Sequence, residues 1–174
     1  MSGITTTGST VFTGLERLPE GLLLWRGILQ WLGGIGIIVM AMVFLPELKV
    51  GGMQVFRSEA FETMGKILPR AAEIASRISV IYVGLTVACA LIYMGLGMTP
   101  FDAVVLAMST LATGGMANSD ASFFNYGAGV HYVAVVFMFL SALPYVRYVQ
   151  LTGGSAGPLL ADRQIRVFGI VVLA

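Results

Sequence analysis

Apolar residues fall into long runs that polar and glycine-rich stretches separate. A helix needs about 20 apolar residues to cross the hydrocarbon core of a bilayer. Three runs reach that length: Gly21–Leu45, Ile74–Leu96 and Gly129–Leu151. A run over Phe101–Ala112 has only the length of a re-entrant half-helix, and a last one covers 167–174. The pattern therefore predicts three spanning helices, one re-entrant helix and the start of a further span.

The re-entrant helix has a clear start signal. Thr99 has the side chain of an N-cap residue, Pro100 suits the first helical position, and Asp102 would meet the positive end of the helix. We therefore expect this helix to begin at Pro100, with its C-terminal end directed towards the segment that follows.

A short phrase rich in threonine and glycine occurs twice. The range 5–10 reads Thr-Thr-Thr-Gly-Ser-Thr, and the range 110–115 reads Thr-Leu-Ala-Thr-Gly-Gly. Each copy is followed by a polar loop and then by an apolar run. When Thr7-Gly8 is aligned with Thr113-Gly114, the range 74–151 is a complete unit of helix, re-entrant helix, extended loop and helix. The first copy is then the end of an earlier unit.

Composition and charge place these units in a membrane. Hydrophobic residues make up 57% of the chain and charged residues 11%, whereas about 25% charged is usual for a soluble domain. The net charge of +1 comes without a basic cluster, so we expect no nucleic-acid partner. The range 95–130 has no Lys or Arg, and basic residues flank it in 46–77 and 147–166. The positive-inside rule therefore places 46–73 and 152–166 in the cytoplasm and both threonine–glycine segments outside.

The two segments have the composition of an ion selectivity filter. A dehydrated monovalent cation needs several oxygen ligands at once, and irregular backbone lining a pore supplies them as carbonyls. Glycine permits the backbone conformations that turn successive carbonyls to one side, and threonine hydroxyls add further oxygens. The predicted filter residues are Thr5, Thr6, Thr7, Gly8, Ser9, Ala112, Thr113, Gly114 and Gly115.

Several other polar residues lie close to these segments in the sequence. Asp120 either attracts cations or caps a loop turn. Arg26 either supports the filter through carbonyl or carboxylate partners, such as Glu16 or Glu20, or extends to the membrane surface. Gln30 is expected to hydrogen-bond to a neighbouring helix. Gly33, Gly34 and Gly36 are interpreted as positions of close packing.

An enzyme would need paired catalytic groups at membrane depth. Asp102 and Asp120 are single acidic residues in the outer half, and His131 is the one histidine. We therefore expect no enzymatic activity, no cofactor and no metal other than the transported cation.

The chain resembles the Trk/Ktr/HKT superfamily of potassium transporters, in particular the bacterial TrkH-type subunit. The matching stretches follow the family's order along most of the chain: 1–8, 24–26, 30–36, 50–57, 97–103, 112–115, 119–122 and 137–138. The stretch Ala142-Leu-Pro-Tyr-Val-Arg147 departs from the family pattern, and its proline would kink the third helix.

The resemblance implies an all-α membrane protein built of helix–re-entrant pore loop–helix repeats of the potassium-channel-like type. It implies potassium uptake, with sodium as the alternative ion, through a filter in which Gly8 and Gly114 are the key glycines. It further implies a multi-pass protein of the bacterial inner membrane that is a homodimer regulated by a cytosolic nucleotide-binding subunit.

The expected organisation has four parts. The range 1–45 is the filter strand and inner helix of an incomplete first repeat, and 46–73 is a cytoplasmic linker. The range 74–151 is a complete repeat, and 152–174 is a second linker with the start of another helix. Because members of the superfamily have four repeats, the alternative to potassium uptake is a truncated, non-conducting membrane fragment or an assembly subunit.

Overall fold

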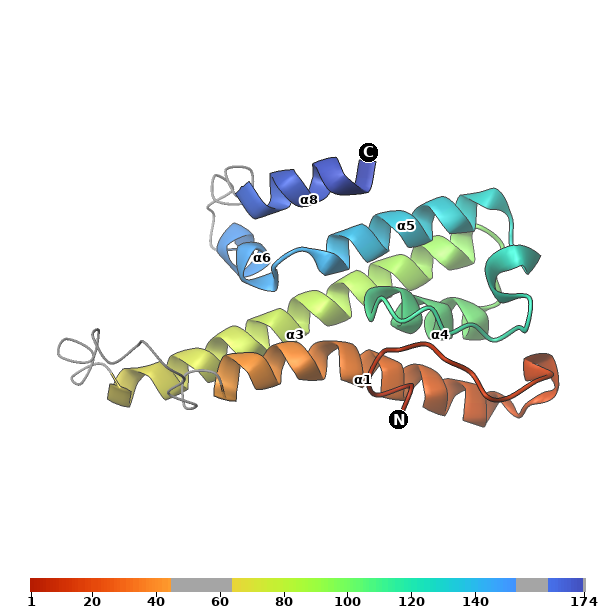
Figure 1. The fold of residues 1–174 in the computed structure, drawn as a ribbon, viewed down its shortest axis with the longest axis horizontal. Coiled ribbons are helices and arrows are strands. Elements are labelled where there is room, and N and C mark those ends of the chain that lie inside the picture. The colour runs from red at the N-terminus through yellow and green to blue at the C-terminus, as the bar shows by residue number, and fades with distance from the viewer. Residues whose placement is uncertain (45–63, 153–162, 174) are drawn as a thin grey trace.

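The structure is a computed structural model that describes residues 1–44, 64–152 and 163–173. In these ranges every regular element is a helix, as the sequence predicted. Three long helices run roughly alongside one another: α1 (Glu20–Phe44), α3 (Met64–Gly95) and α5 (Ala128–Ala142), and the shorter α4 (Pro100–Leu111) lies among them (Figure 1). The remaining elements are η1 (Leu15–Arg17), η3 (Ser122–Asn125), α6 (Tyr145–Thr152) and α8 (Arg163–Leu173).

The short helix α4 is the centre of the fold. It packs against α3, α1 and α5, and Ala103, Leu106 and Ala107 are completely buried. The hydroxyl groups of Tyr93 on α3 and Thr110 on α4 lie 2.9 Å apart in this core. Because α4 is enclosed on several sides, its C-terminal end and the segment that follows are held in a defined place.

The predicted start of α4 is confirmed. The backbone N–H of Asp102 donates to Thr99 Oγ1 at 3.2 Å, and Pro100 lies in the first turn. The Thr99 hydroxyl in turn donates to Asp102 Oδ2 at 2.8 Å. Asn118 Nδ2 donates to the other carboxylate oxygen, Asp102 Oδ1, at 2.8 Å. The cap therefore also fixes the polar loop that follows the second threonine–glycine segment.

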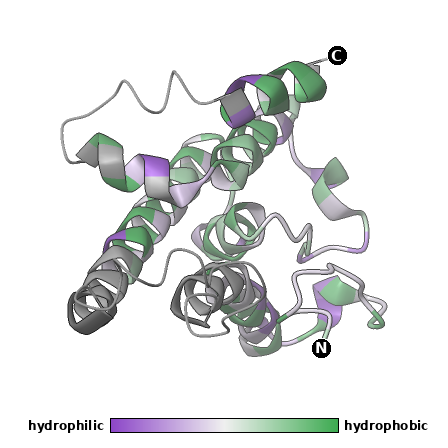
Figure 2. Cartoon of the chain, turned by 60° about the vertical axis from the view of Figure 1, so that its left-hand side comes forward, coloured by the Kyte–Doolittle hydropathy of each residue, from purple (hydrophilic) through white to green (hydrophobic). Residues whose placement is uncertain are grey.

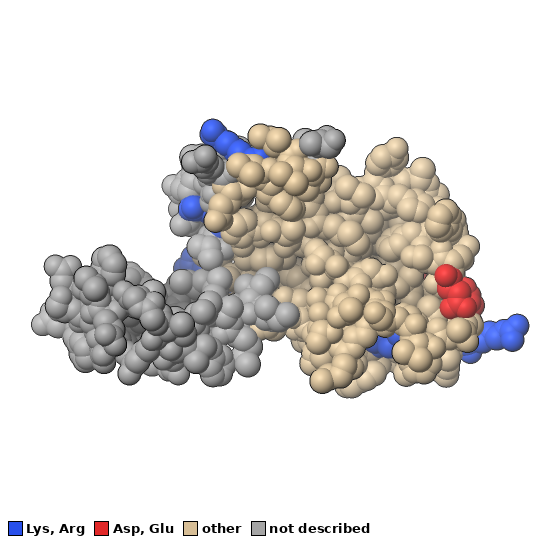
Figure 3. Space-filling model, viewed as in Figure 1, with Lys and Arg blue, Asp and Glu red and all other residues tan. Residues whose placement is uncertain are grey.

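One helix of the described residues meets the length and composition of a membrane-spanning element. In the described part of the chain, the stretch Ala75–Gly95 of α3 is long and apolar enough to cross a bilayer. Helix α1 has 25 residues, which at about 1.5 Å per residue exceeds a hydrocarbon core of about 30 Å. Hydrophobic residues, drawn in green, recur along the described helices (Figure 2). In the space-filling view the charged side chains lie mainly near the two ends of the visible face (Figure 3).

The predicted third span is divided in two. One helix was expected over Gly129–Leu151, but α5 ends at Ala142 and α6 begins at Tyr145. Leu143 between them is extended, with φ −72° and ψ 151°. Proline disfavours helical backbone in the residue before it and lacks the N–H that would continue the ladder. Pro144 therefore interrupts the helix rather than merely kinking it.

Two further helix boundaries differ from those expected. The apolar stretch Ala75–Gly95 of α3 agrees with the predicted span, but the helix itself extends back to Met64, and α8 begins at Arg163 instead of Val167. The first turns of α3 and α8 contain polar and charged residues. The expected bounds came from apolar runs, and an apolar run does not show where a helix begins when its first turns are polar. Most of the predicted linker 46–73, and the range 153–162 of the second, lie outside the described residues.

The cap of α4 gives a first prediction. Thr99→Ala removes the side-chain acceptor for the Asp102 N–H, and we expect the protein to lose about 1 kcal/mol of stability. Thr99→Ser keeps the hydroxyl and should remain close to the original protein. Thermal unfolding of both variants in detergent measures the difference. Equal losses in the two variants would show that the threonine methyl group, and not the cap, is what matters.

Candidate ion filter

The two threonine–glycine segments have the same backbone hydrogen bonds. In the first, the N–H groups of Thr5, Thr6 and Thr7 donate to residues 1, 3 and 2. In the second, the N–H groups of residues 112, 113 and 114 donate to residues 108, 110 and 109. The corresponding distances are 3.1, 3.0 and 3.1 Å in both segments. The last two bonds form the Schellman arrangement that ends a helix. Each segment therefore leaves a helical turn in the same way.

Backbone angles show the same repetition. Thr6 and Thr113 have φ of 54° and 52°, and Gly8 and Gly115 have φ of 77° and 72°. This left-handed region is unfavourable for residues other than glycine. The structure therefore pairs Gly8 with Gly115 and Thr7 with Gly114. The sequence alignment, which paired Gly8 with Gly114, differs from this register by one residue, because a shared Thr-Gly pair does not reveal where the helical turn ends.

The two segments touch each other. A Cβ atom placed on Gly8 would collide with the carbonyl oxygen of Gly114. In Figure 1 the N-terminal segment lies alongside α1, close to the segment that follows α4. Two stretches more than a hundred residues apart in the sequence thus form neighbouring strands, and a side chain at position 8 would separate them.

The carbonyl groups of both strands are available to a ligand. Among the hydrogen bonds of the described residues, none uses the carbonyl oxygens of 4–10 or 112–118. The hydroxyls of Thr5 and Thr7 lie 2.8 Å apart and add further oxygens in the first strand. Neutral oxygens on irregular backbone are ligands that can replace the water around a monovalent cation.

One face of α1 supports both strands. A Cβ atom on Gly33 would collide with the carbonyl of Ile4, and one on Gly34 would lie 3.0 Å from the Cα of Ala112. Gly27 on the same face would place its Cβ 2.9 Å from Val105 of α4. Close packing is thus confirmed for Gly33 and Gly34. Gly36 has no described atom within 4 Å of such a Cβ, so close packing there stays a prediction.

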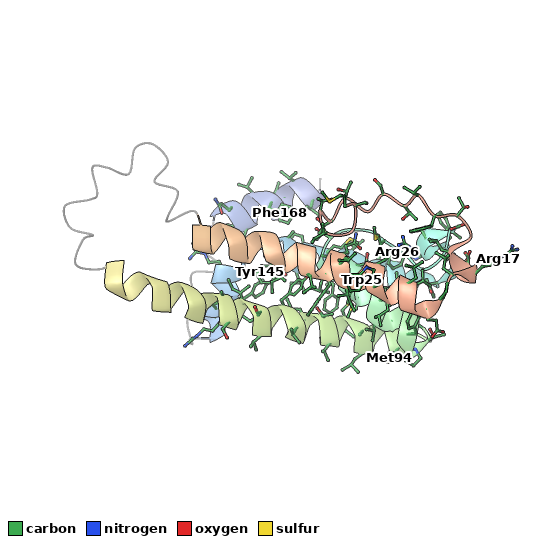
Figure 4. All side chains as sticks on the ribbon, turned by 90° about the horizontal axis from the view of Figure 1, so that it is seen from below. Arg17, Trp25, Arg26, Met94, Tyr145 and Phe168 are labelled. Carbon is green, nitrogen blue, oxygen red and sulfur yellow. The ribbon has the colours of Figure 1, made fainter. Side chains whose placement is uncertain are left out.

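Arg26 turns inward to the outer end of the first strand. Its Nη2 donates to Thr10 Oγ1 at 2.9 Å, and its guanidinium lies 5.9 Å from the centre of the Phe12 ring. The side chain is only 9% exposed. Figure 4 shows Arg26 within the molecule, whereas Arg17 projects from its end. The partner is therefore Thr10 rather than the carboxylates of Glu16 or Glu20 that the sequence suggested.

Two carboxylates join the polar loops that follow the two threonine–glycine segments. Asp120 accepts from the backbone N–H groups of Gly14 and Leu15 at 2.6 and 3.1 Å. In the opposite direction, Glu16 accepts from Ser119 Oγ at 2.6 Å and from the Asp120 N–H at 3.0 Å. Each loop thus supplies a carboxylate to the other. Of the two interpretations of Asp120, loop capping is what its contacts show, and cation attraction remains a prediction.

These contacts also shift the acidity of Glu16. The hydrogen bond from the Ser119 hydroxyl, aided by backbone N–H groups, stabilises the carboxylate and lowers the pKa of Glu16 below its ordinary value. Sequence reasoning considered Glu16 only as a partner of Arg26 and gave Ser119 no role at this site. Nothing in the spacing of 16 and 119 indicates that they meet, because their proximity follows from the contact between the two repeats.

An aromatic cluster lies on the other side of the strands. Trp31 of α1 stacks on Tyr82 of α3 with ring centres 5.4 Å apart, and Tyr82 meets Tyr145 edge to face at 6.0 Å. Tyr82 also donates to the Trp31 carbonyl at 3.1 Å, and Trp31 Nε1 donates to Thr86 at 3.0 Å. Figure 4 shows Tyr145 among the helices rather than on the outside. These rings hold α1, α3 and α6 together.

Comparison with known proteins points to one family. The model of the TrkH family, described as a cation transport protein, matches residues 1–151. The chain is 49% identical to the Trk system potassium uptake protein TrkI of Halomonas elongata, over 99% of this chain and 35% of that protein. It is 42% identical to the Trk system potassium uptake protein TrkH of Vibrio parahaemolyticus, over 96% of this chain and 36% of that protein.

A solved structure agrees with the fold. The crystal structure of the potassium transporter TrkH from Vibrio parahaemolyticus has a TM-score of 0.79 and 38% sequence identity to this chain. The similarity covers 97% of this chain and 34% of that one. The chain thus spans about a third of the length of the relatives that it matches.

The Glu16 contact gives a prediction of pH dependence. Because the pKa of Glu16 is lower in the folded protein than in the unfolded one, its carboxylate stabilises the folded state above its ordinary pKa. This contribution is lost as the pH falls through the folded-state pKa. We expect Glu16→Gln to remove that part of the acid dependence of thermal unfolding.

Glu20→Gln is the matched control, since Glu20 lies in the first turn of α1 and outside the contact between the loops. It should leave the acid dependence close to that of the original protein. If Glu16→Gln and the original protein lose stability in parallel from neutral to acidic pH, the loop contact does not depend on the ionised carboxylate.

Proposed function

The chain belongs to the TrkH family of cation transport proteins, and we propose that it supplies two strands of the selectivity filter in a potassium uptake pathway. The observation that carries the proposal is the pair of strands at Gly8 and Gly115, which share one hydrogen-bonding register and lie in contact. Two such strands are half of what the four-repeat architecture implied by the resemblance would require, and the chain spans about a third of the relatives' length.

The chemistry of the strands favours a monovalent cation. Their oxygens belong to carbonyls and hydroxyls, and the nearby carboxylates of Asp120 and Glu16 are held by N–H and hydroxyl donors of the loops. A pore lined by neutral oxygens binds a cation without trapping it. Inward movement of K⁺ would be favoured by about 2.3 kcal/mol per charge for each 100 mV of membrane potential. Potassium is the ion named for the relatives, and sodium is the alternative.

We place the protein in the bacterial inner membrane as a multi-pass transporter rather than an enzyme. The charge bias along the sequence supports an outward-facing filter, with 46–73 and 152–166 in the cytoplasm. A homodimer and a cytosolic nucleotide-binding regulator are the partners that the family resemblance suggests. The C-terminal end of α4 would direct its partial negative charge towards the ion.

The glycine with positive φ in the second strand gives the test of function. In the full-length transporter that contains this segment, Gly115→Ala forces a side chain into the left-handed region, at a cost of about 1–2 kcal/mol. The strand can relieve this strain by turning its carbonyl oxygens, so we expect the ratio of K⁺ to Na⁺ permeability to fall, by at most the roughly five- to thirtyfold that corresponds to that energy. Rubidium and sodium fluxes in cells that lack other potassium uptake systems measure the ratio.

Gly84→Ala is the matched control, because Gly84 lies on an exposed face of α3 with no described atom near an added Cβ. It should leave the permeability ratio unchanged. An original protein that carries no K⁺ would refute the proposed function. A Gly115→Ala variant with normal selectivity would refute the assignment of this strand to the filter.

A further inference from the structure

A fully buried amide lies directly behind the second strand. The Gln30 side chain is 0% exposed, and neither its nitrogen nor its oxygen has a hydrogen-bond partner among the described residues. Leaving a buried polar group unpaired costs about 1–3 kcal/mol, so the Gln30 amide calls for a partner or a role. The sequence suggested that Gln30 bonds to a neighbouring helix, but its side chain is directed at non-helical backbone.

The position of Gln30 ties it to Gly114. A Cβ atom on Gly114 would collide with the amide nitrogen, Cδ and Cγ of Gln30. Gln30 also sits in the middle of the α1 face that carries Gly27, Gly33 and Gly34, the three glycines that approach α4 and the two strands. Residues three or four apart share one face of a helix. The amide is therefore the polar group at the centre of an otherwise small-residue contact surface.

The hydrogen-bonding capacity of the strand shows what the amide can do. The Gly114 N–H already donates to the Ser109 carbonyl at 3.1 Å. The carbonyl oxygens of 112–118 are not used by the described hydrogen bonds, and a glutamine amide carries two N–H donors. The donors of Gln30 and the acceptors of the second strand are thus complementary and adjacent.

We propose that Gln30 is a positioning residue for ion selectivity. In the conducting transporter its amide would donate to a carbonyl oxygen of the backbone around Gly114 and so fix the direction of the oxygens that the second strand turns towards the cation. Discrimination between K⁺ and Na⁺ depends on the geometry and number of these oxygens. This inference rests on the proposed function, since it assigns a specificity determinant to the same filter.

The first experiment replaces the amide by an apolar group of similar size in the full-length transporter. Gln30→Leu removes the donors but keeps the volume. We expect the K⁺ to Na⁺ permeability ratio to fall by roughly three- to tenfold, as for the loss of one hydrogen bond, with thermal stability unchanged or increased. A purely structural amide would leave the ratio unaltered.

Thr86→Val is the matched control. It removes a buried hydroxyl that accepts from Trp31 and donates to the Tyr82 carbonyl, away from both strands. It should lower stability without changing the permeability ratio. If Gln30→Leu also leaves the ratio unchanged while the original protein selects K⁺, the inference about Gln30 fails and the proposed function stands.

A second experiment tests the contact independently of transport. Gly114→Ala introduces a Cβ atom where the Gln30 amide lies, so truncation by Gln30→Ala should partly restore stability in the double variant. The same truncation should not rescue Gly115→Ala, because that variant is strained by its own backbone. Thermal unfolding of the purified full-length proteins gives the two coupling energies. If Gln30→Ala couples equally to Gly114→Ala and to Gly115→Ala, the contact between Gln30 and Gly114 is wrong. This result does not depend on whether the original protein carries K⁺.

Discussion

The close approach of one face of α1 to two non-helical strands is the constraint on which the rest of the structure depends. Irregular backbone is tolerated at membrane depth only where protein encloses it or water reaches it. Gly33 and Gly34 let the strand backbones at Ile4 and Ala112 come within contact of the helix. A larger residue at either glycine would push a strand away and remove the enclosure that makes its irregular conformation possible.

The strands are also held at their outer ends. The reciprocal contacts of Glu16 and Asp120 bind the loops of the two repeats to each other, and the Thr99 cap fixes the start of the helix that leads into the second strand. Arg26 holds the first strand through Thr10. The apolar core positions α4, but short polar contacts determine where the backbone after it can go.

Much of this could be read from the sequence, and the exceptions have physical reasons. Helix content, the re-entrant length of α4 and its capping residues depend on local composition and were predicted correctly. The break at Pro144 depends on how far a proline disrupts a helix, which a run of apolar residues does not reveal. The register of the strands and the meeting of Glu16 with Ser119 depend on contacts between distant segments. No local pattern records such contacts.

The two strands have the same backbone conformation, but the space beside the residue before Gly8 and before Gly115 is filled in different ways. At the position of Thr7 the strand supplies its own hydroxyl, which bonds to Thr5. At the position of Gly114 the strand supplies nothing, and Gln30 of α1 occupies the space. A ring of identical subunits would have to repeat any change at such a position in every copy. Repeats joined in one polypeptide are free of that symmetry, so each strand can acquire its own support while the path of the backbone stays the same.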